Sequence, residues 1–302
     1  MRFAWIESLM FSLLIAAAIP AFAADEGKDA DSAQDKDKDK KKDEKPIPPE
    51  KTAVSHGSVD IGGHAVRYTA TAGNVLIRED KEDKPEASVF YVAYTADDAK
   101  GSNRPVTFFY NGGPGSSSVW LHMGSLAPVR VESASASATA PPPYHLVPNR
   151  YSLIDKSDLV FIDAVGTGFS TPVGKAKGKD FWGVDEDLTA FAKAITRYVT
   201  INQRWNSPKF LFGESYGTTR SAGLVDKLQG QGMAFNGVVL LSSILNYAAN
   251  SPGLDQNYIG SLPTFAAIAW YHDKVPNKPA SMEAFVNEAR AFATGGYAIA
   301  LA

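Results

Sequence analysis

The segment Gly213-Glu214-Ser215-Tyr216-Gly217 has the residue types and spacing best suited to chemistry in this chain. A short, mostly apolar run, 209–212, precedes it, and a helical pattern, 218–228, follows it. A serine on a tight strand-to-helix turn is held in a strained backbone state, and flanking glycines leave room for its hydroxyl. The pattern predicts that Ser215 is the nucleophile of an acyl transfer. The alternative is an ordinary serine in a strand–helix loop.

A second glycine-rich turn, residues 111–118, follows another apolar run and reads Asn-Gly-Gly-Pro-Gly-Ser-Ser-Ser. Two consecutive glycines, Gly112 and Gly113, let backbone amides point into a site without a Cβ in the way. An oxyanion hole needs donors of this kind, and each is worth roughly 10² to 10³ in rate. A plain Gly/Pro turn or a phosphate-binding loop is the alternative, but the turn holds no lysine, which makes a phosphate loop a poor match.

Four short apolar runs, 106–110, 159–162, 209–212 and 237–241, are the elements that position these turns. Such runs suit strands buried on both faces of a parallel sheet, whose carboxyl edge carries ligand-binding loops. A helix is predicted at 184–199, where Asp185, Glu186 and Asp187 crowd a first turn that favours negative charge. Further helices are expected over 265–271 and 282–292.

The region from His56 to Thr95 alternates polar and apolar residues and predicts antiparallel strands. Gly62-Gly63 and Gly73-Asn74 are interpreted as turns between these strands. The whole pattern predicts an α/β protein in which N-terminal antiparallel strands lead into a mostly parallel central sheet.

Composition excludes several classes of function. The 302 residues hold 30 Lys plus Arg against 33 Asp plus Glu, so no basic field favours nucleic acid. There is no cysteine, which removes disulfides, thiol catalysis and thiolate metal sites. None of the five histidines forms a His-x-x-x-His pair, so no zinc ligand set is visible. No metal and no cofactor is expected.

The N-terminal residues are predicted to lie outside the folded domain. Residues 1–23 read as a signal peptide: Arg2, an apolar stretch from Leu9 to Ile19, and Ala21-Phe22-Ala23 before the cleavage point. A membrane anchor is the alternative, but the stretch falls short of the roughly 20 residues that span a bilayer. Residues 24–54 are predicted to be a disordered charged linker, or else an interaction tail. We therefore expect an exported protein, periplasmic or secreted, that is not inserted in a membrane once the signal is removed.

Three motifs in order resemble the serine carboxypeptidases, the peptidase S10 family of α/β-hydrolases, most closely their bacterial exported branch. They are the 111–118 turn, Ile-Asp-Ala-Val-Gly-Thr-Gly-Phe-Ser at 162–170, and Gly-Glu-Ser-Tyr-Gly at 213–217. The resemblance implies an α/β-hydrolase core over residues 55–246 and the start of a helical cap over 247–302. It also implies that the cap is incomplete and that the chain is a fragment or a natural truncation.

The resemblance assigns roles to six residues. Ser215 would attack the last peptide carbonyl, and the amides of Gly113 and Tyr216 would form the oxyanion hole. The substrate α-carboxylate would be held by Asn111, the Gly112 amide and Glu214. Because Glu214 can donate a hydrogen bond to a carboxylate only while protonated, peptide binding should weaken as pH rises.

The chain departs from the family pattern in three places. Ser116 stands where many members have cysteine, and Ser125 where many have a second glutamate that tunes Glu214. The third departure concerns the triad, which runs Ser, Asp, His along this fold. No base and no orienting acid is assigned, because the later candidates follow no buried-strand pattern; they are Asp226, Asp255, His272, Asp273, Glu283 and Glu288.

Three functions are compatible with these residues. The leading one is a serine carboxypeptidase acting on peptides or the C-termini of small proteins. An esterase or acyltransferase on the same scaffold is the second. The third is a catalytically dead remnant that binds peptide carboxylates without turning them over. The sequence makes no prediction of oligomeric state.

Overall fold

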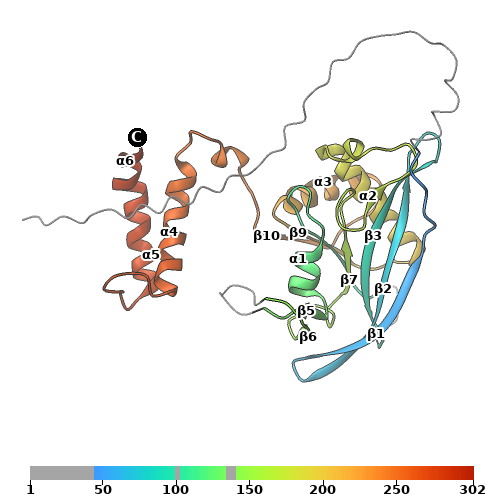
Figure 1. Ribbon diagram of the computed structural model, residues 1–302, viewed down its shortest axis with the longest axis horizontal. Coiled ribbons are helices and arrows are strands. Elements are labelled where there is room, and N and C mark those ends of the chain that lie inside the picture. Colours follow the sequence, from blue (N-terminus) through green and yellow to red (C-terminus); the bar gives the residue numbers. More distant parts are fainter. Residues whose placement is uncertain (1–43, 99–102, 134–140) are drawn as a thin grey trace, which may run out of the picture. The chain divides into compact units, whose positions relative to one another are not determined.

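The computed structural model describes residues 44–98, 103–133 and 141–302 (Figure 1). The predicted signal peptide, 1–23, and most of the predicted linker, 24–43, lie outside the described residues. Among the described residues, no helix combines the length and the apolar character that crossing a membrane requires.

The central sheet has the strand order β1-β2-β3-β7-β4-β9-β10, with β8 (Thr171–Pro172) paired to the N-terminal part of β3. β1 (Thr52–Ile61), β2 (His64–Arg78) and β3 (Pro85–Ala96) pair antiparallel with one another, and β3 pairs antiparallel with β7 (Asp158–Ile162). β7, β4 (Val106–Tyr110), β9 (Lys209–Glu214) and β10 (Gly237–Leu241) are parallel. The predicted change from antiparallel to parallel pairing is therefore confirmed, as is the α/β class.

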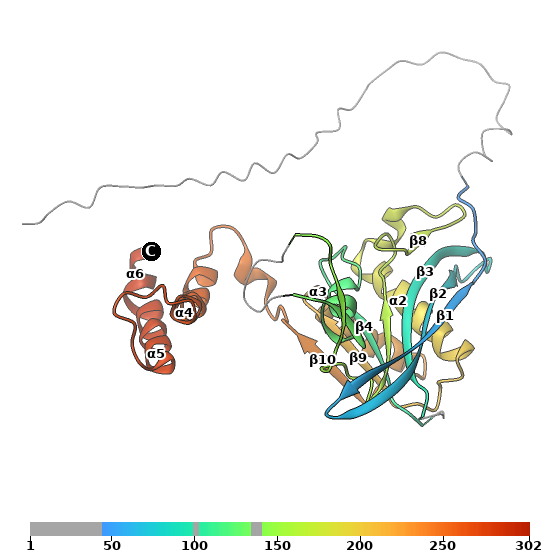
Figure 2. The same cartoon turned by 60° about the horizontal axis from the view of Figure 1, so that its bottom comes forward.

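The N-terminal strands differ from the prediction at one point. Gly62 and Gly63 form the tight β1–β2 turn with φ of 61° and 83°, but Gly73-Asn74 lies inside β2 and makes no turn. β2 runs as one long strand next to β1 and β3 (Figure 2). A Cβ on Gly73 would stand 2.9 Å from the Lys51 carbonyl oxygen and 3.2 Å from the Tyr91 hydroxyl. The glycine serves close packing in the sheet, which a sequence pattern cannot distinguish from a turn.

Alternate residues of the parallel strands feed two separate cores on the two faces of the sheet. Phe108, Tyr110 and Leu211 pack in the core beneath α2 (Val184–Ile201) and α3 (Tyr216–Gly230). Phe109 and Phe161 pack in the opposite core, with Leu121 of the short helix α1 (Val119–Leu121). The side chains of a strand alternate between the two faces of the sheet, so consecutive residues near the end of a strand are buried in opposite cores. The loop that follows such a strand therefore starts from a fixed position.

Short elements complete the domain around the sheet. A two-stranded ribbon is formed by β5 (Val129–Val131) and β6 (Leu146–Pro148), and the turn η2 (His122–Leu126) follows α1 directly. A 3₁₀ turn, η3 (Gly178–Phe181), leads into α2.

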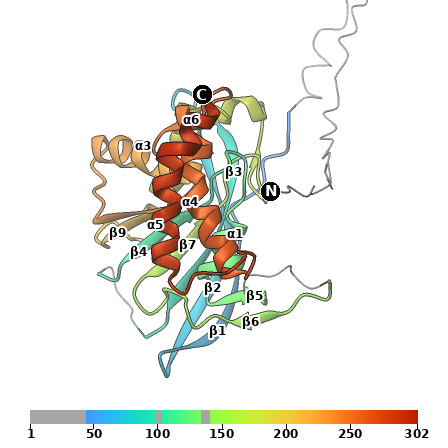
Figure 3. The ribbon, with the colours of Figure 1, turned by 90° about the vertical axis from the view of Figure 1, so that its left-hand side faces the viewer.

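Residues 247–301 form helices joined by short irregular segments, with no strand among them. The helices are η4 (Tyr247–Asn250), α4 (Gln256–Tyr271), α5 (Met282–Phe292), η5 (Ala293–Tyr297) and α6 (Ala298–Leu301). α4 and α5 lie side by side as a helical pair (Figure 3). The helices predicted over 265–271 and 282–292 are confirmed, the first as the C-terminal half of α4.

Candidate active site

Ser215 occupies the turn between β9 and α3 in a strained backbone conformation. Its φ of 56° and ψ of −123° place it in a region that side-chain-bearing residues rarely adopt. Its amide donates to the Leu241 carbonyl of β10 at 3.0 Å, and its own carbonyl accepts from the Thr218 amide at 2.9 Å. Hydrogen bonds on both sides therefore hold the strained residue in place.

The turn formed by residues 213–217, called the elbow below, has room only for glycine at positions 213 and 217. A Cβ on Gly213 would stand 2.1 Å from the Gly217 carbonyl oxygen, and one on Gly217 would stand 2.8 Å from the Tyr110 carbonyl oxygen. Neither position has room for a side chain, because backbone lies directly against it. This accounts for the Gly-x-Ser-x-Gly spacing in physical terms.

The glycine turn after β4 lies directly on this elbow. A Cβ on Gly112 would be 2.4 Å from the Tyr216 amide nitrogen and 2.7 Å from the Glu214 carbonyl oxygen. Gly113, the next residue, has a φ of 109°, which glycine adopts without strain. The two turns singled out in the sequence are thus in backbone contact at one edge of the sheet.

Asn111 and Glu214 are brought together by the same contact. Asn111 is buried, and its Nδ2 donates to Glu214 Oε2 at 2.9 Å. Its Oδ1 accepts from the Leu121 amide at 3.0 Å, which orients the side-chain amide. Within the described residues, hydrogen bonds reach Oε2 of Glu214 and leave Oε1 free to meet another group.

A buried arginine, Arg220, connects three elements of the candidate site, and no sequence pattern points to it. Arg220 of α3 is 1% exposed and donates to both carboxylate oxygens of Asp187, at 2.7 and 3.1 Å. Its third nitrogen donates to the Asn111 carbonyl at 2.8 Å. Its guanidinium carbon lies 4.2 Å from the centre of the Phe191 ring. In the sequence, Asp187 is distinguished only as one of three acids in the first turn of a helix.

The 162–170 motif supports the glycine turn from the other side. The Asp163 carboxylate accepts from the Ser118 amide at 2.8 Å and from the Phe169 amide at 3.3 Å. Gly168 makes this possible, since a Cβ there would stand 2.0 Å from Asp163 Oδ2. Burial raises the pKa of Asp163, and the two amides oppose that rise. Asp163 therefore positions the loop and does not touch Ser215.

Within the described part of the chain, no hydrogen bond or ion pair joins Ser215 to the acids and the histidine that follow it in the sequence. Asp226 lies within α3, and Asp255 precedes α4. His272 caps the C-terminus of α4 and stacks edge-on against Tyr271, while Asp273 forms an ion pair with Lys278 at 2.6 Å. Among the described residues, no group of three or more His, Asp or Glu is arranged to hold a metal ion.

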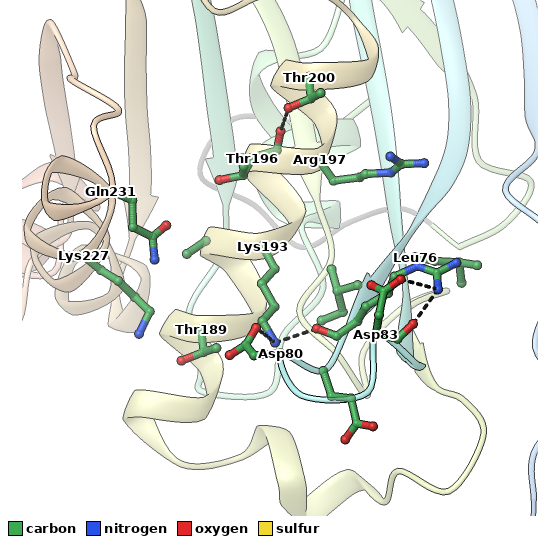
Figure 4. Close-up of a pocket in the computed structure, with 14 residues that line it drawn as sticks. Leu76, Asp80, Asp83, Thr189, Lys193, Thr196, Arg197, Thr200, Lys227 and Gln231 are labelled. Carbon is green, nitrogen blue, oxygen red and sulfur yellow. Dashed lines mark hydrogen bonds and ion pairs between the residues drawn. The ribbon is translucent and has the colours of Figure 1, made fainter.

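A separate hollow of about 620 Å³ lies between the end of β2 and α2 (Figure 4). Several of its charged side chains already have partners: Lys193 contacts Asp80 at 3.1 Å, and Arg197 contacts Glu50 at 2.7 Å. It contains neither the elbow nor the glycine turn, so it is not the candidate active site.

The comparisons with known proteins agree with this geometry. A model of the serine carboxypeptidase family matches residues 64–261. The pheromone-processing carboxypeptidase KEX1 of Saccharomyces cerevisiae is 36% identical over 128 residues, which make up 40% of this chain and 16% of that protein. The crystal structure of Kex1(delta)p, a prohormone-processing carboxypeptidase from the same yeast, has a TM-score of 0.51 at 19% identity and covers 76% of this chain and 48% of that one.

The sheet order, the elbow and the glycine turn define an α/β-hydrolase. With the family match over most of the domain, the chain belongs to the serine carboxypeptidase family. It spans less than half the length of the solved relative and about a sixth of the curated one.

Replacing Gly112 tests the contact between the two turns. Gly112→Ala should lower the free energy of unfolding by about 1–3 kcal/mol, because the new Cβ overlaps the Tyr216 amide. Gly124→Ala is the matched control: its Cβ would meet only the Val119 carbonyl oxygen, at 3.8 Å, so the change should stay within about 0.5 kcal/mol. Denaturant unfolding measures both. Equal stability of the two variants would contradict the contact.

His122, which follows the glycine turn, should make the fold sensitive to acid. It packs on the Phe161 ring and hydrogen-bonds the Tyr94 hydroxyl at 2.8 Å, and burial lowers its pKa from 6.5 to about 4. The unfolded chain binds a proton at this histidine near pH 6.5, whereas the folded protein binds it only near pH 4. The free energy of unfolding should therefore fall by up to about 3 kcal/mol as the pH drops from 6.5 to 4.

The measurement is the unfolding free energy at a series of pH values for the wild type, His122→Gln and His56→Gln. His122→Gln should remove part of the loss between pH 6.5 and 4. The control, His56→Gln, changes an exposed histidine of β1 and should retain it. Parallel pH curves for all three proteins would rule out His122 as the source.

Proposed function

We propose that these residues supply the nucleophile, the oxyanion donors and the carboxylate site of a serine carboxypeptidase. Ser215 Oγ attacks the carbonyl carbon of the last peptide bond and gives its proton to a general base, which is not assigned among the described residues. The tetrahedral oxyanion is held by the amides of Gly113 and Tyr216. Collapse breaks the C–N bond as the base returns its proton to the leaving nitrogen, which releases the C-terminal amino acid and leaves an acyl ester on Ser215. Water then attacks the ester, releases the shortened peptide as an acid and restores the Ser215 hydroxyl.

The observation that carries the proposal is the contact of Asn111 and Gly112 with the elbow. The Asn111–Glu214 hydrogen bond of 2.9 Å stands one residue before the nucleophile. Gly112 packs within contact of Tyr216. Groups able to bind a carboxylate thus lie one residue away from the reacting serine, which suits a substrate cleaved at its free C-terminus and not in its interior.

The test compares an N-blocked dipeptide bearing a free C-terminal carboxylate with the same dipeptide amide. The acid should be cleaved with kcat/KM at least a hundredfold higher, because the amide cannot use the carboxylate site. Glu214→Gln keeps a hydrogen-bonding side chain and should retain the preference, whereas Glu214→Leu should lose most of it. Ser215→Ala provides the blank.

The outcomes separate the three functions. Equal cleavage of acid and amide, or faster cleavage of simple esters, would replace the proposal with an esterase. A protein that binds the acid but neither cleaves it nor reacts with a fluorophosphonate at Ser215 would be a peptide-binding module.

We also propose that the protein is exported, as in the bacterial branch that its motifs resemble. The support is the order of Arg2, the apolar stretch up to Ile19 and Ala21-Phe22-Ala23. N-terminal sequencing of the protein from its native cells should then begin at Ala24. A sequence beginning at Met1 in a membrane fraction would favour an uncleaved anchor instead.

A further inference from the structure

The peptide unit that joins Asn111 to Gly112 is held on one side and free on the other. Its carbonyl oxygen, on Asn111, accepts a hydrogen bond from Nη1 of Arg220 at 2.8 Å, and no other described residue donates to it. Its amide, on Gly112, donates to no group within the described residues. This free amide is one of the groups proposed to bind the substrate α-carboxylate, so its direction decides whether a carboxylate is recognised.

The hydrogen bond from Arg220 fixes the direction of that amide. The Asn111–Gly112 bond is trans, and the C=O and N–H of a trans peptide unit lie in one plane and point in opposite directions. With the carbonyl directed at the buried guanidinium, the Gly112 amide has to point away from it. Arg220 thereby orients a donor that lies on the other side of the peptide unit.

Glycine makes this restraint necessary. Without a Cβ, Gly112 can adopt backbone angles that are closed to other residues, so the peptide unit before it is able to turn over. The Gly112 carbonyl belongs to the next peptide unit and is held separately, by the Ser116 amide at 3.1 Å. Among the described residues, the bond from Arg220 is therefore the one hydrogen bond that opposes rotation of the Asn111–Gly112 unit.

Arg220 is firmly held and out of reach of a substrate. It is 1% exposed, and its other two nitrogens donate to the two carboxylate oxygens of Asp187. Its guanidinium carbon lies 4.2 Å from the centre of the Phe191 ring and 5.2 Å from that of the Tyr216 ring. A side chain buried in this way affects substrate binding only through the groups that it holds.

We propose that Arg220 is a positioning residue for recognition of the substrate α-carboxylate: it holds the Asn111 carbonyl so that the Gly112 amide points at the carboxylate. The inference rests on the proposed function, which supplies that carboxylate. The backbone of Ser215 is held independently, by the Leu241 carbonyl and the Thr218 amide. Loss of the bond from Arg220 should therefore weaken binding of the free carboxylate and leave the nucleophile in place.

The experiment measures binding without turnover, using the full chain with Ser215→Ala as the parent. Calorimetry gives the Kd of an N-blocked dipeptide with a free C-terminal carboxylate and of the same dipeptide amide. The parent should bind the acid at least about tenfold more tightly than the amide, because only the acid uses the charge-assisted hydrogen bonds of the carboxylate site. The ratio of the two Kd values is the readout, since a general loosening of the site weakens both ligands alike.

Arg220→Lys in the parent removes the clamp and keeps the charge beside Asp187. One ammonium group cannot span both the carboxylate and the Asn111 carbonyl as the guanidinium fork does. The acid-to-amide preference should fall at least about fivefold, as expected when a hydrogen bond to a charged group is lost. The Kd of the amide should change less than twofold.

Arg204 provides the matched control at the opposite end of β4. It is also buried, contacts the Asp158 carboxylate at 2.6 Å and donates at 2.7 Å to the carbonyl of Arg104, two residues before β4. Arg204→Lys thus removes the same kind of clamp away from the site. It should lower the melting temperature, as Arg220→Lys does, and retain the acid preference of the parent.

A second variant covers the case in which Arg220→Lys does not fold. Asp187→Leu combined with Arg220→Met replaces the buried pair by apolar side chains, a change that proteins often tolerate because no charge is left unpaired. It also removes the donor to the Asn111 carbonyl, so it should lose the acid preference to the same extent. Circular dichroism of each variant checks that it folds.

An acid preference that is unchanged in a folded Arg220 variant would overturn the inference, as would an equal fall in Arg204→Lys. A parent without any acid preference would overturn it too, because there would be no carboxylate site to position. The proposed function is judged separately, by cleavage of the acid over the amide with Ser215 intact. Selective cleavage with a preference that survives Arg220→Lys would leave the function standing and refute the positioning role. A preference that depends on Arg220 in a protein that cleaves neither ligand would do the reverse.

Discussion

The buried ion pair between Arg220 and Asp187 is the interaction on which the geometry of the site depends. It joins α3, which follows Ser215, to the first turn of α2, and the same guanidinium donates to the Asn111 carbonyl at the end of β4. Removing one partner of such a pair costs about 3–5 kcal/mol, because the other charge is left buried and unpaired. Three elements that are distant in sequence are thus held in a single arrangement.

With these elements fixed, the groups proposed to bind the oxyanion are backbone amides and not side chains. The proposed oxyanion donors, the Gly113 and Tyr216 amides, are on two turns that touch through Gly112. Asp163 anchors the far end of the glycine turn through the Ser118 amide. Donors fixed in this way need little reorganisation when charge develops on a substrate oxygen, which is the main advantage of a preorganised site.

Much of this arrangement could be predicted from local sequence. The strands 106–110 and 237–241 and the helix 282–292 have the predicted bounds, because dense apolar runs and helical periodicity are local signals. The juxtaposition of 111–113 with 214–216 also follows from two parallel strands ending at one edge. The Arg220–Asp187 pair could not be predicted, since both residues fit an ordinary solvated helix and only the tertiary structure buries them. The turn predicted at Gly73-Asn74 is wrong for a related reason: Gly73 makes room for neighbouring strands, and a local stretch of sequence does not show which strands are neighbours.

One edge of the sheet, at β10, is open to pairing with another chain. β10 has a partner only on its β9 side among the described residues, and four of its side chains are 40–50% exposed: Val238, Val239, Leu240 and Leu241. An unpaired, apolar edge offers its free amides and carbonyls to any extended peptide that meets it. Concentrated samples are therefore exposed to intermolecular strand addition, and crystallisation or NMR work on these 302 residues has to shield that edge first.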